Sequence, residues 1–122
     1  MSSIQRSRPE DEYFFPEGCY ILELSNSDAD ADVSIARARV LPGVTTQWHS
    51  LRATAERYLI LEGHGRVEIG EGAPADVGPG DVVIIPPDTA QRIHNLSTHV
   101  DLIFLAICSP RFTPDAYQSL PL

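Results

Sequence analysis

An imidazole and a carboxylate stand seven residues apart in the middle of the chain, at His49 and Glu56. If the backbone turns between Leu51 and Thr54, we expect the two side chains to face each other from neighbouring strands. Such a pair supplies good ligands for iron, manganese, nickel or zinc. Without a metal, partial burial beside a neutral imidazole would raise the pKa of the Glu56 carboxyl group, which suits a general acid or base near neutral pH.

Tyr58 is a second candidate catalytic residue, because it shares strand parity with Glu56 and would line the same cavity. The alternative is an ordinary inward aromatic side chain that fills the barrel. Arg37 and Arg39 alternate with small apolar residues, so we expect both guanidinium groups to lie outside the barrel. The opposite register would bring them into the cavity as a clamp for a carboxylate or phosphate.

Strands must position these residues, because helical patterns are almost absent. Ten prolines and eight glycines divide the sequence into short runs, and no window repeats apolar residues with a helical period. Strands without crossover helices imply antiparallel pairing, and unpaired edges favour a closed sheet. The sequence therefore predicts an all-β jelly roll or small barrel. The expected strands are Gly18–Leu24, Val33–Leu41, Thr45–His49, Glu56–Leu61, Gly65–Ile69, Asp81–Ile85, Gln91–Asn95 and Val100–Cys108.

Composition excludes several classes of partner. The formal net charge is −8 and all nine basic residues are arginines, so a phosphate backbone or an anionic membrane would be repelled. No apolar run reaches the length of a membrane span, and residues 1–12 lack the apolar segment of a secretory signal. We therefore expect a cytoplasmic protein that binds neither nucleic acid nor membrane. Cys19 and Cys108 are expected to be buried free thiols.

The 122 residues suffice for one domain. We expect a single domain over residues 1–122, with a flexible N-terminal segment at 1–12 and a tail at 109–122. That tail contains three prolines and no periodic pattern. It could pack over one end of the barrel through Phe112 and Tyr117, or it could fray.

Two spaced motifs resemble those of the cupin superfamily. Residues 43–63 carry Gly43, His49, Glu56 and Gly63 at the offsets of the first cupin motif, and residues 80–95 carry Gly80, Pro86 and Asn95 at those of the second. Leu51 stands at the position of the second histidine of the first motif. Asp88 and Gln91 replace the glycine and the histidine of the second. The resemblance covers most of the chain and implies a double-stranded β-helix, the jelly-roll barrel of the small single-domain cupins.

In that family the barrel holds a divalent metal through two histidines and a glutamate of the first motif and one histidine of the second. The resemblance therefore implies a metal site of His49, Glu56 and Gln91. Because Leu51 cannot coordinate a metal and Gln91 offers only a neutral carbonyl oxygen, we expect iron, manganese, nickel or zinc to bind weakly or not at all. If no metal binds, we expect the same residues to form a buried cluster joined by hydrogen bonds.

Two functions follow, and the sequence alone does not decide between an enzyme and a binding protein. The first is a metal-assisted isomerase, cyclase, lyase or dioxygenase that acts on a small polar or anionic metabolite. The second is a metal-free barrel that binds a small molecule, or only dimerises, without catalysis. A homodimer is expected in either case, because Trp48 and the apolar run Leu102–Ile107 offer more apolar surface than a monomer of this size covers.

Overall fold

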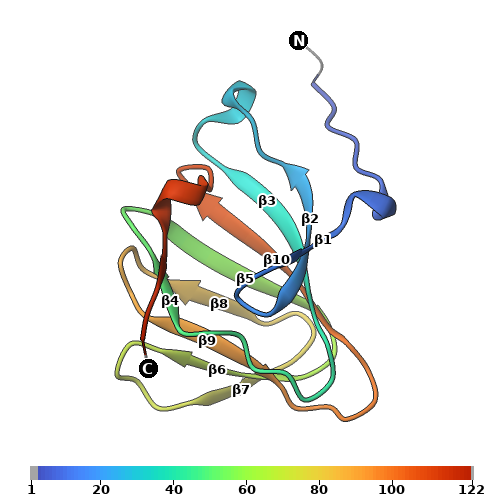
Figure 1. Ribbon diagram of the computed structural model, residues 1–122, viewed down its shortest axis with the longest axis vertical. Helices are drawn as coiled ribbons and strands as arrows, with labels where there is room; N and C mark the ends of the chain where they lie inside the picture. The colour runs from blue at the N-terminus through green and yellow to red at the C-terminus, as the bar shows by residue number, and fades with distance from the viewer. Residues whose placement is uncertain (1–2, 122) are drawn as a thin grey trace.

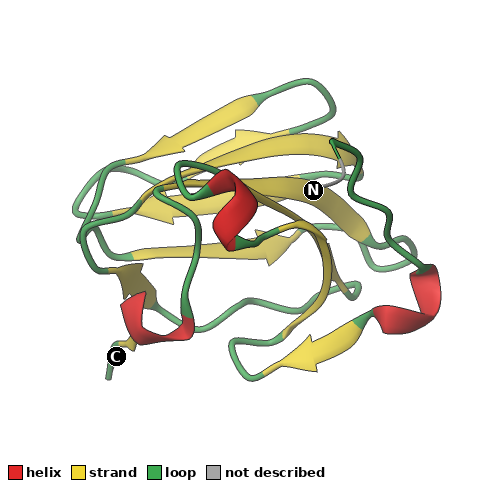
Figure 2. Ribbon diagram, turned by 90° about the horizontal axis from the view of Figure 1, so that it is seen from above, coloured by secondary structure: helices red, strands yellow, loops and turns green. Residues whose placement is uncertain are grey.

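Two facing antiparallel sheets form the body of the molecule in the computed structural model, which describes residues 3–121 (Figure 1). Residues 1, 2 and 122, at the ends of the predicted domain, lie outside the described part. No α-helix occurs within residues 3–121, only three short 3₁₀ turns (Figure 2). The predicted all-β jelly roll, a double-stranded β-helix, is confirmed.

The first sheet has six strands and the second has five. In spatial order, the first contains β1 (Tyr13–Phe15), β2 (Cys19–Ser25), β3 (Ser34–Val40), β10 (Leu102–Ser109), β5 (Ala55–Glu62) and β8 (Val82–Ile85). The second contains β11 (Tyr117–Ser119), β4 (His49–Leu51), β9 (Gln91–Asn95), β6 (Gly65–Ile69) and β7 (Ala75–Val77). The 3₁₀ turns are η1 (Pro9–Asp11), η2 (Asp28–Asp30) and η3 (Pro114–Ala116).

The core lies between the sheets and follows from strand alternation. Along β5, Glu56, Tyr58 and Ile60 are buried while the residues between them are more exposed. Ile93 from β9 and Leu102 from β10 meet them with no exposed surface. Since alternate side chains of a strand share one face, the same alternation that buries Ile60 also directs Glu56 inward.

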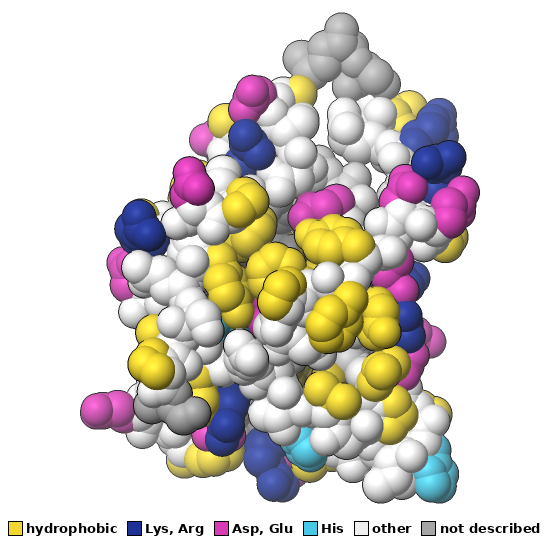
Figure 3. Space-filling model, in the orientation of Figure 1, with side chains coloured by type: hydrophobic (Ala, Val, Ile, Leu, Met, Phe, Trp, Pro, Cys, Tyr) yellow, Lys and Arg dark blue, Asp and Glu magenta, His cyan; other side chains and the backbone are white. Residues whose placement is uncertain are grey.

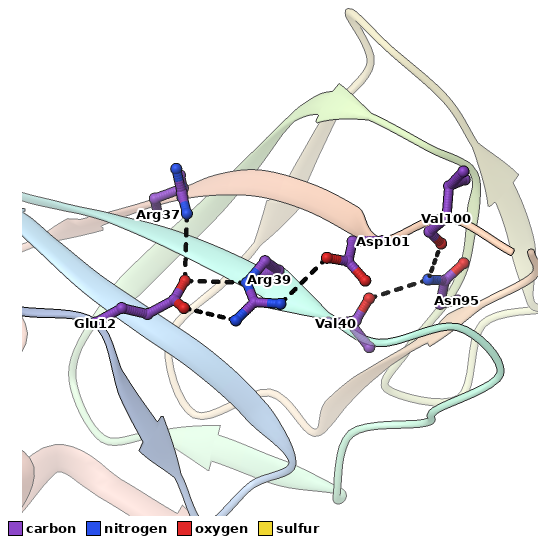
Figure 4. Close-up of polar contacts among 7 residues, drawn as sticks. All are labelled: Glu12, Arg37, Arg39, Val40, Asn95, Val100 and Asp101. Atoms are coloured by element: carbon purple, nitrogen blue, oxygen red, sulfur yellow. Dashed lines mark hydrogen bonds and ion pairs between the residues drawn. The ribbon is translucent and has the colours of Figure 1, made fainter. Parts of the chain in front are cut away.

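Two motif residues hold the barrel's turns. Gly63 has a φ of +86°, and an added Cβ would lie 2.7 Å from the Asp101 carbonyl oxygen, so only glycine fits. The fully buried Asn95 amide donates to the carbonyl oxygens of Val40 (3.0 Å) and Val100 (2.9 Å), which ties β9 to two chain segments (Figure 4). These contacts give the motif a structural role that is independent of any ligand.

Asp88, at the position of a motif glycine, also has positive φ, at +61°. Aspartate tolerates this conformation better than most residues. Its carboxylate accepts a hydrogen bond from the Ala53 amide at 3.1 Å, and its own amide donates to the Leu51 carbonyl oxygen at 2.9 Å. The Asp88 turn is thereby fixed to the turn between β4 and β5.

One expected strand was misplaced. The sequence predicted Thr45–His49, whereas the strand β4 begins at His49 and Thr45 forms only an isolated bridge to His94. The backbone amides of residues 46 and 47 donate to different partners, Ile93 and Glu17, so no continuous ladder forms there. The short strands β1, β7 and β11 were not predicted, because three residues give too little alternation to read.

The tail packs over the barrel, one of the two expected alternatives. Its strand β11 pairs with β4, and the Tyr117 ring contacts Phe15 edge-on at 5.0 Å between centroids. Within residues 3–121, no helix has the length and apolar character needed to span a membrane.

Candidate active site

His49, Gln91 and Glu56 come together inside the barrel, but from both sheets. His49 on β4 pairs directly with Gln91 on β9, and Glu56 lies on β5 of the facing sheet. The expectation that His49 and Glu56 occupy neighbouring strands was therefore wrong. The turn after Leu51 carries the chain across the barrel instead of folding it back beside β4, and a positive φ of 52° at Ala53 makes this possible.

The His49 ring is held in one tautomer. Its Nδ1 donates to the Gln47 carbonyl oxygen at 2.8 Å, so Nε2 carries the lone pair, and this atom lies 3.7 Å from Glu17 Oε2. The ring stacks on Tyr117 with centroids 5.1 Å apart and is only 2% exposed. Burial lowers the pKa of His49, while the Gln47 carbonyl and the Glu56 charge oppose that shift.

Gln91 is engaged by Tyr58. The Tyr58 hydroxyl donates to Gln91 Oε1, and both side chains are buried. Burial raises the pKa of Tyr58 well above its ordinary value, and the nearby Glu56 adds to the shift. The phenol therefore stays protonated at neutral pH and serves as a donor. A catalytic role for Tyr58 stays a prediction.

Glu56 is the residue with unused bonding capacity. It is 8% exposed, and its Oε2 accepts a hydrogen bond from the Cys108 thiol at 3.8 Å. Oε1 is buried and has no hydrogen-bond partner within residues 3–121. Burial, followed by repulsion from Glu17, raises the pKa of Glu56 to about 7, whereas His49 and Gln91 oppose the shift. A carboxyl group with this pKa can give or take a proton near neutral pH.

Glu17 is a site residue that the sequence analysis missed. It lies in the turn between β1 and β2, its side chain is 15% exposed, and burial raises its pKa to about 7. Its carbonyl oxygen accepts the Gln47 amide at 2.8 Å, which fixes the turn beside the His49 segment. No pattern marks Glu17, because it precedes the first long strand and belongs to neither motif.

A small pocket opens onto Glu56, with an interior volume of about 50 Å³. Three carboxylates line it, from Glu17, Glu23 and Glu56, together with the aromatic rings of residues 13, 15 and 112. Figure 3 shows apolar side chains gathered over the middle of one face of the molecule, with acidic side chains among them. The pocket therefore combines an acidic interior with apolar walls.

Both arginines of β3 lie outside the barrel, as expected. Glu12 bridges them, with contacts of 3.2 Å to Arg37 and 2.6 Å to Arg39, and Arg39 also pairs with Asp101 at 3.2 Å (Figure 4). Their neighbours in sequence face inward: Ala36 lines the pocket and Ala38 is 2% exposed. The alternative in which the guanidinium groups clamp an anion inside the cavity is thereby excluded.

The family's metal site does not fit this donor set. Leu51 is an apolar side chain, 3% exposed, at one ligand position, and the Gln91 oxygen at another already accepts the Tyr58 hydroxyl. His49 and Glu56 are the two strong donors that remain from the family set. Across the described residues, no group of three or more histidine, cysteine or acidic side chains is arranged to hold a metal ion.

Comparison with known proteins decides the family. A family model for the cupin domain matches residues 36–108, more than half of the chain. The chain belongs to the cupin family. This cupin is also 32% identical over 110 residues to "Uncharacterized protein MJ1618" of Methanocaldococcus jannaschii, an alignment that covers 88% of this chain and 86% of that protein.

Solved cupin structures show the same fold. KdgF from Halomonas sp. aligns with a TM-score of 0.78 and 19% identity, over 94% of this chain and 98% of its own. Streptomyces Pac13, described as a nucleoside dehydratase, aligns with a TM-score of 0.77 and 15% identity, over 96% and 91% of the two chains. Oxalate decarboxylase from Bacillus subtilis aligns with a TM-score of 0.82 and 22% identity, over 98% of this chain and 32% of its own. At these identities the likeness shows the fold alone.

Proposed function

We propose that this cupin binds a small polar metabolite in its barrel and acts on it by acid–base chemistry, with Glu56 as the group that transfers the proton. One observation carries the proposal: Glu56 lines the pocket with a buried oxygen, Oε1, that has no hydrogen-bond partner in the part of the chain that the structure describes. A substrate N–H, hydroxyl or acidic C–H group would supply the missing donor. The raised pKa supports this role, because about 7 is the range in which a carboxyl group exchanges protons at neutral pH.

Isomerisation and elimination are the reaction classes that fit this site best. The Glu56 carboxylate would take a proton from substrate carbon or oxygen, and the resulting acid would return it to another atom of the same molecule or to a leaving hydroxyl group. Atoms balance without an oxidant or a second substrate. Glu17 is a second carboxyl group with a pKa of about 7 and lines the same pocket, so it could exchange the proton with solvent at the mouth. The dehydratase named among the structural relatives supports elimination as chemistry that this fold accommodates.

We further propose that catalysis does not depend on a tightly bound metal. The loss of two of the four family ligand positions, at Leu51 and Gln91, supports this. We expect dialysis against EDTA to leave ligand binding and turnover unchanged, and elemental analysis of the purified protein to find well under one equivalent of iron, manganese, nickel or zinc. A full equivalent of metal that survives the chelator would contradict the proposal.

A homodimer remains part of the proposal, but the surface expected for it was wrong in part, because Leu102 and Phe104 of the apolar run are buried within the chain itself. Val82 and Ile84 on β8, a strand at the edge of its sheet, are 57% and 69% exposed. An exposed apolar edge of this kind is a common pairing surface. We expect light scattering at micromolar concentration to give twice the mass of one chain, and a monomer mass would contradict the dimer.

The acid–base proposal can be tested without knowing the substrate. Pools of small hydroxy and carbonyl metabolites are incubated with the protein in D₂O, and NMR follows deuterium incorporation, isomerisation or loss of water. We expect one class of metabolite to react, and Glu56→Gln to slow that reaction by about 10²–10⁴-fold. The matched control is Glu71→Gln, which removes one negative charge from an exposed position and should react like the unaltered protein.

Equal rates for Glu56→Gln and the unaltered protein would refute the catalytic role of this residue. If a metabolite binds but is not converted, the protein is a binding module, the second function expected from the sequence.

A further inference from the structure

Acidic groups line the pocket, and no cationic side chain of the described residues accompanies them. Glu17, Glu23 and Glu56 line it, and no arginine within residues 3–121 does so. The sequence contains no lysine, and the two arginines of the adjacent strand β3 point to the other face of the sheet. A ligand that enters this pocket therefore meets carboxyl groups and no positively charged side chain.

An independent observation shows that the pocket has unused acceptor capacity. Glu56 is 92% buried and its Oε1 has no hydrogen-bond partner among the described residues. A buried acceptor without a donor is costly in a folded protein, and each such atom calls for an explanation. An N–H group at this position would satisfy the oxygen, and a charged N–H group would do so most strongly.

The walls of the pocket are apolar and fixed in place. The Phe112 ring lies edge-on to Phe15, with centroids 6.4 Å apart, and both rings line the pocket. The Phe112 backbone amide donates to Ser34 Oγ at 2.8 Å, and the Phe112 carbonyl oxygen accepts a hydrogen bond from Asn26 Nδ2 at 2.9 Å. Aromatic rings in this arrangement cover short alkyl chains and attract cations to their faces.

We propose that the ligand of this pocket is a small organic cation, a protonated primary amine on a short hydrocarbon chain. Its ammonium group would donate to Glu56 Oε1 and face Glu17, while its alkyl part would lie against Phe15 and Phe112. The interior volume of about 50 Å³ limits the buried part to a few heavy atoms. A carboxylate or phosphate would add a further negative charge beside three carboxyl groups and is disfavoured. The inference rests on the proposed small-molecule binding in this pocket and specifies the charge of the ligand.

Three probes with one carbon skeleton test the charge. Butylamine, butan-1-ol and butanoate are titrated into the protein, and the shifts of backbone amide NMR signals give each affinity. We expect butylamine to bind about tenfold or more tightly than butan-1-ol, and butanoate not to bind. Glu17→Gln should weaken butylamine binding about tenfold, whereas the matched control Glu71→Gln should change it less than about twofold.

Folding of each variant is checked from the same NMR spectra. If Glu17→Gln does not fold, Glu23→Gln removes another pocket carboxylate and should weaken butylamine binding in the same direction. Tighter binding of butan-1-ol or butanoate than of butylamine would overturn the proposal, as would equal affinity of butylamine for both pocket variants and the control. A Zn²⁺ titration that saturates with one equivalent and excludes butylamine would also overturn it, because the pocket would then be a metal site.

The outcomes separate this inference from the proposed function. If butan-1-ol binds best while Glu56-dependent deuterium incorporation persists, the charge of the ligand is wrong and the acid–base function stands. If butylamine binds and Glu56→Gln leaves conversion unchanged, the ligand class stands and the acid–base function is wrong.

Discussion

The two faces of strand β3 differ in whether the acidic side chains beside them are paired with arginines. On the outer face, Glu12 accepts hydrogen bonds from both Arg37 and Arg39, and Arg39 also contacts Asp101 (Figure 4). On the inner face, Ala36 lines a pocket in which the buried Glu56 has no cationic neighbour among the lining residues. The pKa shifts record the difference: the Arg39 hydrogen bond lowers the pKa of Glu12, and burial raises the pKa of Glu56 to about 7.

This difference separates structural from functional charge. Paired carboxylates of the outer face stabilise the fold at neutral pH, because their charged form is favoured. The pocket carboxylates destabilise it, because their charged form is buried without compensation. Proteins retain such groups where a ligand or a reaction uses them, which is why strongly shifted pKa values cluster at functional sites.

Restoring the family's metal ligands inside the barrel would have the largest effect. The double substitution Leu51→His and Gln91→His restores the two imidazoles of the family's metal site next to His49 and Glu56. We expect the affinity for Ni²⁺ or Zn²⁺ to rise by several orders of magnitude, because each imidazole adds a strong metal–ligand bond. Calorimetric titration would measure the affinity. An affinity equal to that of the unaltered protein would show that these side chains cannot converge on one ion.

The next effect concerns stability against pH. The ordinary pKa of Glu56 is 4.5 and its folded-state pKa is about 7. Below pH 4.5 both states hold the proton; between pH 4.5 and 7 the unfolded chain loses it first, so the free energy of unfolding falls as pH rises. Glu17 acts in the same direction, whereas the lowered pKa of His49 costs stability as pH falls below 6.5.

Glu56→Gln isolates the Glu56 contribution, since glutamine stays neutral. From pH 5 to pH 8 we expect the free energy of unfolding of the variant to rise by about 1–3 kcal/mol relative to that of the unaltered protein. Urea unfolding at both pH values measures this difference. Identical pH dependence for the two proteins would mean that the Glu56 pKa is not raised in the folded state.

The outer ion pairs should show a smaller effect. Arg39→Met removes the contacts with Glu12 and Asp101 and the cation–π contact with Tyr20, in which Arg39 Cζ lies 4.5 Å from the ring centroid. We expect the free energy of unfolding at pH 7 to fall by about 1 kcal/mol, and by less in 1 M salt.

The matched control is Arg66→Met. Arg66 forms an exposed ion pair of 2.8 Å with Asp76, and its removal should leave the unfolding midpoint unchanged. If both arginine variants behave alike, the outer network does not stabilise the fold.

The barrel was predictable because the residues that shape it have strict local requirements. Gly63 cannot carry a side chain beside Asp101, and the Asn95 side chain donates to two carbonyl oxygens. Because few residue types meet these requirements, the two positions can be recognised in the sequence. Strand parity likewise placed Arg37 and Arg39 outside. Strand parity also predicted that His49 and Glu56 point inward. It could not predict that they occupy facing sheets, because that depends on the chain crossing the barrel at the Ala53 turn.

Glu17 could not be predicted for a related reason. A single glutamate in a turn carries no periodic signal, and only the closed barrel brings it within 3.7 Å of His49 Nε2. The acidity of the pocket was missed with it, and the sequence alone left an anionic metabolite as an open possibility. Charge at a site depends on residues far apart in the chain, and a motif read locally reports only some of them.

The pocket walls come from opposite ends of the described chain: Tyr13 and Phe15 lie before the first long strand, and Phe112 follows the last one. Contacts so distant in sequence form slowly and late, because the intervening strands must be ordered first. An intact pocket therefore requires a completely folded barrel. Any ligand that fits the pocket must stabilise the whole domain, since it binds the folded chain and not the unfolded one. Heating the protein with a library of small molecules and reading the melting temperature is thus a sound first search for its natural ligand.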